Sequence, residues 1–274
     1  MTSTPHLFGI LNITSDSFSD GGKYLDPAAA LAHGRKLMAD GAHVLDIGPA
    51  SSHPDGAPVS ATEEIRRLTA VVPVLQGEGA IVSVDTFQTE TQRWALSQNV
   101  AYLNDIQGFA DESFYSELAD ASAKLVVMHS IQGRGPATRA APPAGSMVDH
   151  VTRFFDERFG ALERAGVARD RLILDPGMGF FLGNQPEPSL EVIRGLGVLK
   201  ERFDVPLLLS VSRKSFLRKL AGTEIGGSAA ATLAAELYAA SAGVDMIRTH
   251  EPRQLADSLS IWGHLGSPVG LLTP

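Results

Sequence analysis

Polar and charged side chains gather at the ends of the short apolar runs in this sequence. Asn12 and Asp85 each come directly after a run of aliphatic residues, and other runs lead to a histidine, to further carboxylates and to basic residues. The full set is Asn12, Asp46, Asp85, Asn104, Asp105, His129, Asp175, Ser212 to Ser215, Arg248 and His250. If the runs are parallel strands of a barrel, their carboxyl ends share one rim, and these side chains would meet there.

Three of these residues have the chemistry to recognise a flat, nitrogen-rich ring. Asp85, Asn104 and Asp175 offer carboxylate and amide groups. A carboxylate can accept two parallel hydrogen bonds from an amidine-like edge of a heterocycle. A single aspartate at a strand end is as often a cap or a support for another residue, but three such groups on one rim favour a binding site.

Positive charge gathers after the last two runs. Arg213, Lys214, Arg248 and His250 lie there, in a chain whose net charge is -8. The last strands of barrels often bind phosphate, so this concentration predicts an anionic ligand, although each residue alone could form a surface ion pair. Ser215 begins the next predicted helix and could hold a carboxylate or a phosphate together with backbone N–H groups.

The segment from Asn12 to Gly22 is rich in oxygen ligands. With a phosphate partner, such ligands suit Mg²⁺ better than zinc, although an ordinary turn-rich loop would have the same composition. The sequence has no cysteine, which excludes thiolate nucleophiles and Cys-ligated zinc. It also has no G-x-S-x-G elbow, dinucleotide fingerprint or P-loop. We therefore expect catalysis by positioning and electrostatic stabilisation, without a covalent intermediate.

Eight apolar runs alternate with segments of helical periodicity. The runs are Leu7–Leu11, His43–Ile47, Ala80–Val84, Ala101–Leu103, Lys124–Met128, Arg171–Leu174, Pro206–Ser210 and Val244–Ile247. They lack polar alternation, as strands buried on both faces should. The expected helices include those after an N-cap at Asp26-Pro27, after a capping box at Ser60–Glu63, and over Met147–Ala165 and Ser228–Ala242. This pattern predicts an α/β protein with a (β/α)8 TIM barrel as a single domain over residues 1–274; an open doubly wound sheet is the alternative.

Composition narrows the partners. The chain has 274 residues, with 44% hydrophobic and 20% charged, an ordinary globular balance. The net charge of -8 argues against nucleic acid and against an anionic membrane. No apolar stretch reaches the roughly 18 residues of a membrane span, and no signal peptide is recognisable, so we expect a cytoplasmic protein. The segments 14–23, 48–60 and 132–146 are expected to be the most mobile loops.

As a set, the motifs at the predicted strand ends resemble those of dihydropteroate synthase. The matching segments are Gly9–Asn12 with Asp16–Gly22, Ser83–Thr86, Asn104–Ile106, Met128–His129, Asp175–Phe180, Ser212–Phe216 and Arg248–His250. They occur in the family order over nearly the whole chain, which makes the resemblance far more specific than one motif would. It implies a barrel enzyme of folate biosynthesis that joins 6-hydroxymethyl-7,8-dihydropterin pyrophosphate to p-aminobenzoate, giving 7,8-dihydropteroate and pyrophosphate.

The resemblance also implies a role for each site residue. The pterin would contact Asp85, Asn104, Met128, Asp175, Phe180 and Lys214, and the pyrophosphate would contact Asn12, Ser52, His53, Arg248 and His250. p-Aminobenzoate would contact Phe18, Pro54, Phe180, Arg213 and Ser215. The catalytic residues would be Asn12, Asp85, Asp175 and Lys214, with Asn12 also holding a Mg²⁺ ion on the pyrophosphate. The family further implies a homodimer formed through the last helices.

The sequence departs from the common pattern of the family in three places. Pro49–Pro54 replaces the usual Glu-Ser-Thr-Arg-Pro, so His53 stands where arginine is usual. Phe181-Leu182 replaces Gly-Lys, and the fourth strand is followed by Gln107-Gly-Phe109. These departures resemble the sulfonamide-insensitive branch of the family.

Added aromatic bulk gives a steric reason for such insensitivity. Phe109, Phe181 or Phe216 beside the p-aminobenzoate pocket could exclude the larger sulfonyl group while admitting the planar carboxylate. The alternative is that these phenylalanines belong to the core or support other residues.

Two other functions would use part of the same residue set. A methyltetrahydrofolate:corrinoid methyltransferase domain would share the pterin-reading carboxylates and amide, but it should not need the basic motifs after the last two strands. A catalytically silent pterin- or phosphate-binding module would be suggested by a missing leaving-group site. Asn12, Arg248 and His250 are all present, so only the changed Pro49–Pro54 segment favours that alternative.

Overall fold

The strands of this protein form one parallel barrel. The computed structural model describes residues 4–14, 26–224 and 226–265. Its strands are β1 (His6–Asn12), β2 (Val44–Gly48), β3 (Val82–Asp85), β4 (Tyr102–Asp105), β5 (Lys124–Met128), β6 (Leu172–Asp175), β7 (Leu208–Leu209) and β8 (Met246–Thr249). They pair in the order β6-β5-β4-β3-β2-β1-β8-β7, and a parallel bridge from Leu174 to Leu207 closes the ring. The predicted TIM barrel is confirmed, and the open-sheet alternative is wrong.

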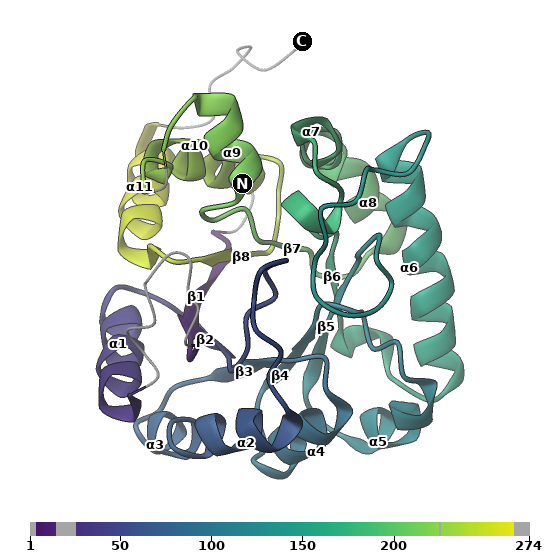
Figure 1. The fold of residues 1–274 in the computed structure, drawn as a ribbon. Helices are drawn as coiled ribbons and strands as arrows, with labels where there is room; N and C mark the ends of the chain where they lie inside the picture. The colour runs from purple at the N-terminus through teal and green to yellow at the C-terminus, as the bar shows by residue number, and fades with distance from the viewer. Residues whose placement is uncertain (1–3, 15–25, 225, 266–274) are drawn as a thin grey trace.

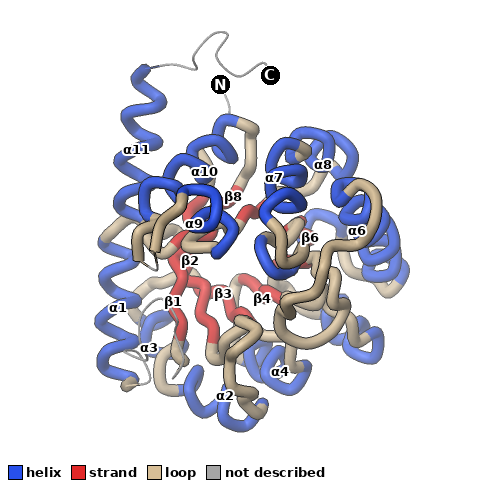
Figure 2. The backbone as a smooth tube through the Cα atoms, turned by 45° about the horizontal axis from the view of Figure 1, so that its top comes forward, coloured by secondary structure: helices blue, strands red, loops and turns tan. Residues whose placement is uncertain are grey.

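Helices surround the strands on the outside of the barrel (Figures 1 and 2). They are α1 (Pro27–Ala39), α2 (Ala61–Thr69), α3 (Val72–Gly77), α4 (Thr89–Ser97), α5 (Tyr115–Asp120), α6 (Met147–Arg164), α7 (Pro186–Arg194), α8 (Leu196–Phe203), α9 (Ser215–Ala221), α10 (Ala229–Ser241) and α11 (Pro252–Leu265). Short 3-10 turns, η1 (Glu112–Phe114), η2 (Arg169–Arg171) and η3 (Gly179–Phe181), add to them. No helix in the described ranges is both long and apolar enough to cross a membrane.

The predicted helix starts are present with their caps. Asp26 accepts hydrogen bonds from backbone N–H groups in the first turn of α1, and Ser60 Oγ accepts one from the N–H of Glu63 at 3.3 Å. These bonds satisfy donors that a helix leaves unpaired at its start. The predicted capping box is only half used, because the Glu63 carboxylate pairs with Arg66 at 2.6 Å and with Arg67 at 2.8 Å.

An apolar cluster fills the inside of the barrel. It comes from the starts and middles of six strands, and its members are Phe8, Val44, Val126, Ile173, Leu208 and Met246. Tyr102 packs edge-on against Phe8, with ring centroids 5.1 Å apart. A larger apolar cluster fills the space between the strands and the helices. Because apolar side chains occupy the inside, polar groups can gather only at the carboxyl ends of the strands.

Candidate active site

A cavity of about 440 Å³ opens at the carboxyl ends of the strands. The predicted site residues that line it are Asn12, Ser52, His53, Pro54, Asp85, Phe180, Arg213, Lys214, Ser215, Arg248 and His250. Asn104, Met128 and Asp175 are buried and do not belong to its lining in this structure. Phe18 lies outside the described residues. Residues spread over most of the sequence therefore share one cavity, as the strand-end pattern predicts.

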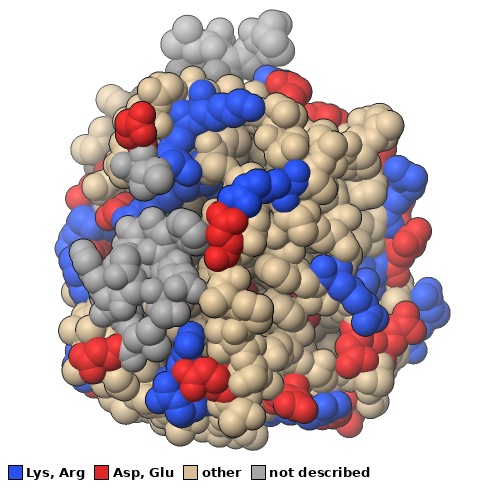
Figure 3. Space-filling view, in the orientation of Figure 1, with Lys and Arg blue, Asp and Glu red and all other residues tan. Residues whose placement is uncertain are grey.

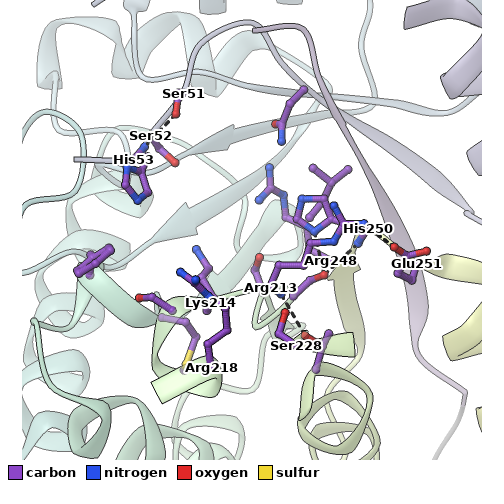
Figure 4. Close-up of a pocket in the computed structure, with 18 of the residues that line it drawn as sticks. Ser51, Ser52, His53, Arg213, Lys214, Arg218, Ser228, Arg248, His250 and Glu251 are labelled. Atoms are coloured by element: carbon purple, nitrogen blue, oxygen red, sulfur yellow. Dashed lines mark hydrogen bonds and ion pairs between the residues drawn. The ribbon is translucent and has the colours of Figure 1, made fainter. Parts of the chain in front are cut away.

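Basic and acidic side chains are interspersed on the outer surface of the face shown in Figure 3. The cavity is different, because several cations meet there. Figure 4 shows His53 on one side of it and Arg248 and His250 on another, with Lys214 and Arg218 on the wall between them. This local concentration of positive charge can offset the negative net charge of the chain for an anionic ligand.

Arg248 connects the carboxylates of two neighbouring strands. Its Nη2 donates a hydrogen bond to Asp85 Oδ2 at 2.6 Å, and its Nε donates one to Asp46 Oδ2. Asn104 Nδ2 also donates to Asp46 Oδ2, at 3.2 Å. The sequence predicted an anion-binding role for Arg248, whereas its guanidinium lies among acidic groups in this structure. Asp46 was noted only as a strand end, and its role as the buried partner of Arg248 was missed.

Acceptors without partners cluster beside this ion pair. Asp46 Oδ1, Asn104 Oδ1 and Ser83 Oγ are buried, and none has a hydrogen-bond partner among the described residues. An unpaired polar atom in the interior costs about 1–3 kcal/mol, so several together are rare in a purely structural core. Their position on the adjacent strands β2, β3 and β4 favours a ligand that brings hydrogen-bond donors.

Burial shifts the proton affinity of the charged groups in this part of the barrel. It raises the pKa of Asp175 to about 6, against the opposing effect of the Gly177 N–H and of Lys214. It also raises the pKa of Asp85, although Arg248 acts in the opposite direction. Burial and the nearby Arg248 lower the pKa of Lys214 to about 8. Groups that titrate this close to neutrality, at a cavity or buried beside it, are typical of functional sites.

Lys214 and Ser215 lie where the chain leaves β7 and enters α9. The Lys214 Nζ is 5.2 Å from the centre of the Phe181 ring, which allows a cation–π contact. Arg218 lies one turn further along α9 and lines the same cavity. Arg218 was not among the residues predicted from the sequence, although its spacing of three residues from Ser215 places both on one face of a helix.

The turn before Lys214 holds Arg213 in an unusual conformation. Its φ is +58°, in the left-handed region that costs a non-glycine residue about 1–3 kcal/mol. The Arg213 guanidinium pairs with Glu251, and its backbone N–H donates to Thr232 Oγ1 at 3.2 Å. Such strain is typical of turns that present a side chain to a ligand.

His250 is held in a fixed orientation beside this turn. Its Nδ1 lies 2.8 Å from Ser212 Oγ, and its backbone N–H donates to the same oxygen at 3.2 Å. Burial and the nearby Arg213 and Arg248 lower the pKa of His250 well below its ordinary value. The imidazole is therefore neutral near pH 7, and His250 is part of the cavity wall.

Asn12 ends β1 close to Gly48. An added Cβ at Gly48 would lie 3.2 Å from Asn12 Oδ1, so glycine leaves room for the amide. No group of three or more His, Asp or Glu side chains suited to a metal ion occurs within the described parts of the chain. A metal ion at Asn12 would therefore need most of its ligands from a substrate and from water.

The phenylalanines proposed for a steric role differ in position. Phe180 and Phe181 line the cavity. The steric hypothesis is wrong for Phe109, because this side chain is buried in the core and does not line the cavity. Phe216 also packs in the core, from the inner face of α9. Of the three, Phe181, which packs with Met128, lines this cavity, whereas Phe216 lines a neighbouring pocket with Ser215 and Arg218.

Comparison with known proteins agrees with this geometry. Residues 8–250 match the family model of pterin binding enzymes. A dihydropteroate synthase type-2 from Escherichia coli is 60% identical over 255 residues, which are 93% of this chain and 94% of that protein. The chain belongs to the dihydropteroate synthase family. Members of this family are transferases, which is the class that the sequence motifs predicted.

Solved structures of the family have the same fold. A Xanthomonas albilineans dihydropteroate synthase with 4-aminobenzoic acid is 34% identical, with a TM-score of 0.87 and coverage of 97% of this chain and 94% of that one. The same enzyme in complex with 7,8-dihydropteroate is also 34% identical, with a TM-score of 0.84 and coverage of 97% and 95%. The strand-end residues of this chain therefore lie on the scaffold of a known family.

Proposed function

We propose that this protein condenses 6-hydroxymethyl-7,8-dihydropterin pyrophosphate with p-aminobenzoate to give 7,8-dihydropteroate and pyrophosphate. The observation that carries the proposal is the meeting of two opposite kinds of chemistry in one cavity. Carboxylate and amide acceptors lie at the ends of β2 to β4, and Lys214, Arg248 and His250 lie beside them. The dihydropteroate and 4-aminobenzoic acid bound to the related Xanthomonas enzyme support the same pair of substrates.

The pterin would bind at the acidic end. Its ring donors would take the place of the Arg248 guanidinium on Asp85, and the unpaired Asn104 Oδ1 would accept a further hydrogen bond. Asp175 would read another part of the ring, with Lys214 beside it. Met128 and Phe180 would contact the ring faces from the neighbouring apolar cluster.

The pyrophosphate would bind toward β8 and β1. Arg248, once displaced from Asp85, would turn its charge to the leaving group, and His250 would donate from its second nitrogen. Ser52 and His53 would contact the pyrophosphate from the loop after β2. Burial and nearby cations lower the pKa of His53, so it would act as a neutral donor where relatives carry arginine.

Asn12 fits a Mg²⁺ ion held on the pyrophosphate. Mg²⁺ prefers oxygen ligands and commonly keeps several waters while binding phosphate oxygens, so one amide oxygen from the protein is sufficient. The space left by Gly48 beside Asn12 Oδ1 is consistent with this arrangement. The ion would neutralise charge on the leaving group.

The amine substrate would lie toward α9. Ser215 would receive the carboxylate of p-aminobenzoate, and Arg218, on the same helix face, would supply the opposite charge. Pro54 and Phe180 would flank its ring, and Arg213 would approach from the strained turn. Since α9 has only seven residues, the side chains contribute more than the helix terminus.

The reaction then follows from the placement of charge. The bond from the exocyclic methylene carbon to the pyrophosphate oxygen breaks, the arylamine nitrogen forms a bond to that carbon, and the amine releases one proton. Arg248 and His250 would stabilise the negative leaving group, while Asp85 and Asp175 would stabilise the pterin cation. These interactions are stronger in the transition state than in the ground state, which is the requirement for catalysis.

Reduced sensitivity to sulfonamides is part of the proposal. Phe181 lies where other members of the family carry glycine, and its ring is packed between Lys214 and the cluster around Met128. A planar carboxylate passes such a ring more easily than a tetrahedral sulfonyl group does. Phe109, which is buried in the core, has no part in this exclusion.

A homodimer through the last two helices is the proposed assembly. Ile261 and Leu265 on α11 are exposed by 61% and 78% of their surface, and α11 packs beside the alanine-rich α10. Exposed apolar side chains on one helix are typical of a subunit interface. The molar mass in solution tests this assembly.

The decisive experiment is incubation of the protein with both substrates and Mg²⁺. We expect 7,8-dihydropteroate and pyrophosphate to appear in equal amounts, and addition of a sulfonamide to inhibit weakly. Binding of the pterin pyrophosphate without product formation would instead identify a silent pterin-binding module. Absence of both binding and product would refute the proposal.

A further inference from the structure

Two loops that follow different strands are joined above the cavity by an ion pair. Arg139, between β5 and α6, donates from Nη1 to Asp55 Oδ1 at 2.7 Å and from Nη2 to Asp55 Oδ2. Asp55 belongs to the loop between β2 and α2. We call this bidentate pair the clasp. A backbone hydrogen bond from the Ala137 N–H to the Ser52 carbonyl, at 3.1 Å, joins the same two loops.

The clasp lies against a residue of the cavity wall. The Arg139 Cζ is 5.7 Å from the centre of the Phe180 ring, and the His53 ring meets the same ring edge-on at 5.8 Å. Gln132 Nε2 donates to the Phe180 carbonyl at 3.0 Å. Loops after β2, β5 and β6 therefore converge on one aromatic side chain that faces the proposed p-aminobenzoate site.

The β5–α6 loop is in turn anchored to the segment after Phe180. Asn184 Nδ2 donates to the Arg139 carbonyl at 3.1 Å, and the Asn184 N–H donates to the Ala140 carbonyl at 2.9 Å. Gly183 makes this approach possible, because an added Cβ would lie 2.9 Å from the backbone nitrogen of Pro142. Arg139 is thus held at its backbone, and its side chain can fix the position of Asp55.

We propose that Arg139 and Asp55 are positioning residues that set the shape of the amine-substrate pocket. The clasp holds the β2–α2 loop, with His53 and Pro54, against Phe180. The three side chains then have fixed positions on the side of the pocket that would contact p-aminobenzoate. Neither Arg139 nor Asp55 lines the cavity, so each acts through the residues that it holds. The inference rests on the proposed function and names a determinant of its amine specificity.

Exposure separates this role from a contribution to stability. The Arg139 and Asp55 side chains are 55% and 45% exposed. Exposed pairs of this kind contribute little to the free energy of unfolding, so breaking the clasp should leave the fold intact. Its loss should instead weaken binding of the amine substrate, because that binding depends on the position of the β2–α2 loop.

The chain offers a matched control. Arg202 Nη2 on α8 donates to both carboxylate oxygens of Asp156 on α6, at 2.9 and 2.8 Å, and the two side chains are 52% and 43% exposed. This pair is also an arginine–aspartate ion pair with nearly the same exposure, and it lies outside the loops that border the cavity. Arg202→Ala therefore removes an equivalent ion pair without touching the clasp.

The test compares Arg139→Ala, Asp55→Ala, Arg202→Ala and the charge-reversed double variant Arg139→Glu with Asp55→Arg. We expect each single change in the clasp to raise the KM for p-aminobenzoate about two- to fivefold, which corresponds to the energy range of an exposed ion pair. The kcat, the KM for the pterin substrate and the Tm should stay at wild-type values. The double variant should recover part of the lost affinity.

Two results would overturn the inference. One is a KM for p-aminobenzoate in Arg139→Ala that equals those of Arg202→Ala and the wild type. The other is a double variant that is worse than either single change, because an ion pair of reversed polarity should restore the contact. A wild-type protein that forms no dihydropteroate would refute the proposed function instead, so the two failures are distinguishable.

Discussion

Replacement of Asp85 by asparagine probes the acidic end of the site with least disturbance to the fold. The change keeps the shape of the side chain and replaces one carboxylate oxygen with an NH₂ group. Arg248 would keep its contact with the buried Asp46, so its guanidinium would not be left without a partner. We therefore expect the free energy of unfolding to fall by only about 1–2 kcal/mol.

The effect on the substrate should be much larger. A hydrogen bond to a charged group contributes about 1.5–3 kcal/mol, and a carboxylate that reads two ring donors makes two of them. The NH₂ group of asparagine would also face an N–H donor of the pterin ring, where no hydrogen bond can form. Losing about 3–6 kcal/mol corresponds to a fall of roughly 10² to 10⁴ in kcat/KM, at 1.4 kcal/mol for each factor of ten.

The assay is the steady-state release of pyrophosphate with the pterin pyrophosphate varied and p-aminobenzoate saturating. Asp156→Asn, in the surface pair with Arg202, is a matched control that should behave as wild type. A kcat/KM for Asp85→Asn within about threefold of wild type, with an unchanged Tm, would refute the assignment of Asp85 to the pterin.

Three further predictions concern the other parts of the site. Arg248→Ala should weaken binding of the pterin pyrophosphate more than binding of the pterin without pyrophosphate, measured by calorimetry; equal losses would remove Arg248 from the anion site. The kcat/KM should fall on the acid side as Asp175 gains a proton near pH 6 and on the basic side as Lys214 loses one near pH 8. Lys214→Arg should move the basic limb upward, and a limb that stays in place would assign it to another group. Phe181→Leu should lower the inhibition constant of a sulfonamide about fivefold or more while the KM for p-aminobenzoate changes less, and parallel changes would contradict a steric role for Phe181.

The sequence alone was sufficient to predict the barrel and many of the polar residues that line the cavity. Eight apolar runs without polar alternation are what parallel strands buried on both faces require, and the structure has a strand at each of them. Asn12, Asp85, Lys214 and Arg248 could be found because each follows such a run, and a barrel brings strand ends to one rim. Arg139 could not be found in this way, because it lies in the middle of the β5–α6 loop, away from the end of any strand.

Only the tertiary structure decided which of these groups interact. Arg248 is separated by 202 and 163 residues from its partners Asp46 and Asp85, and Arg139 by 84 residues from Asp55. Local periodicity reports which side of an element is buried, but it carries no information on partners that barrel closure brings together. For the same reason the sequence could not separate Phe181, at the cavity, from Phe109 and Phe216 in the core. All three are phenylalanines, and only the packing of segments distant in the sequence determines which of them reaches the cavity.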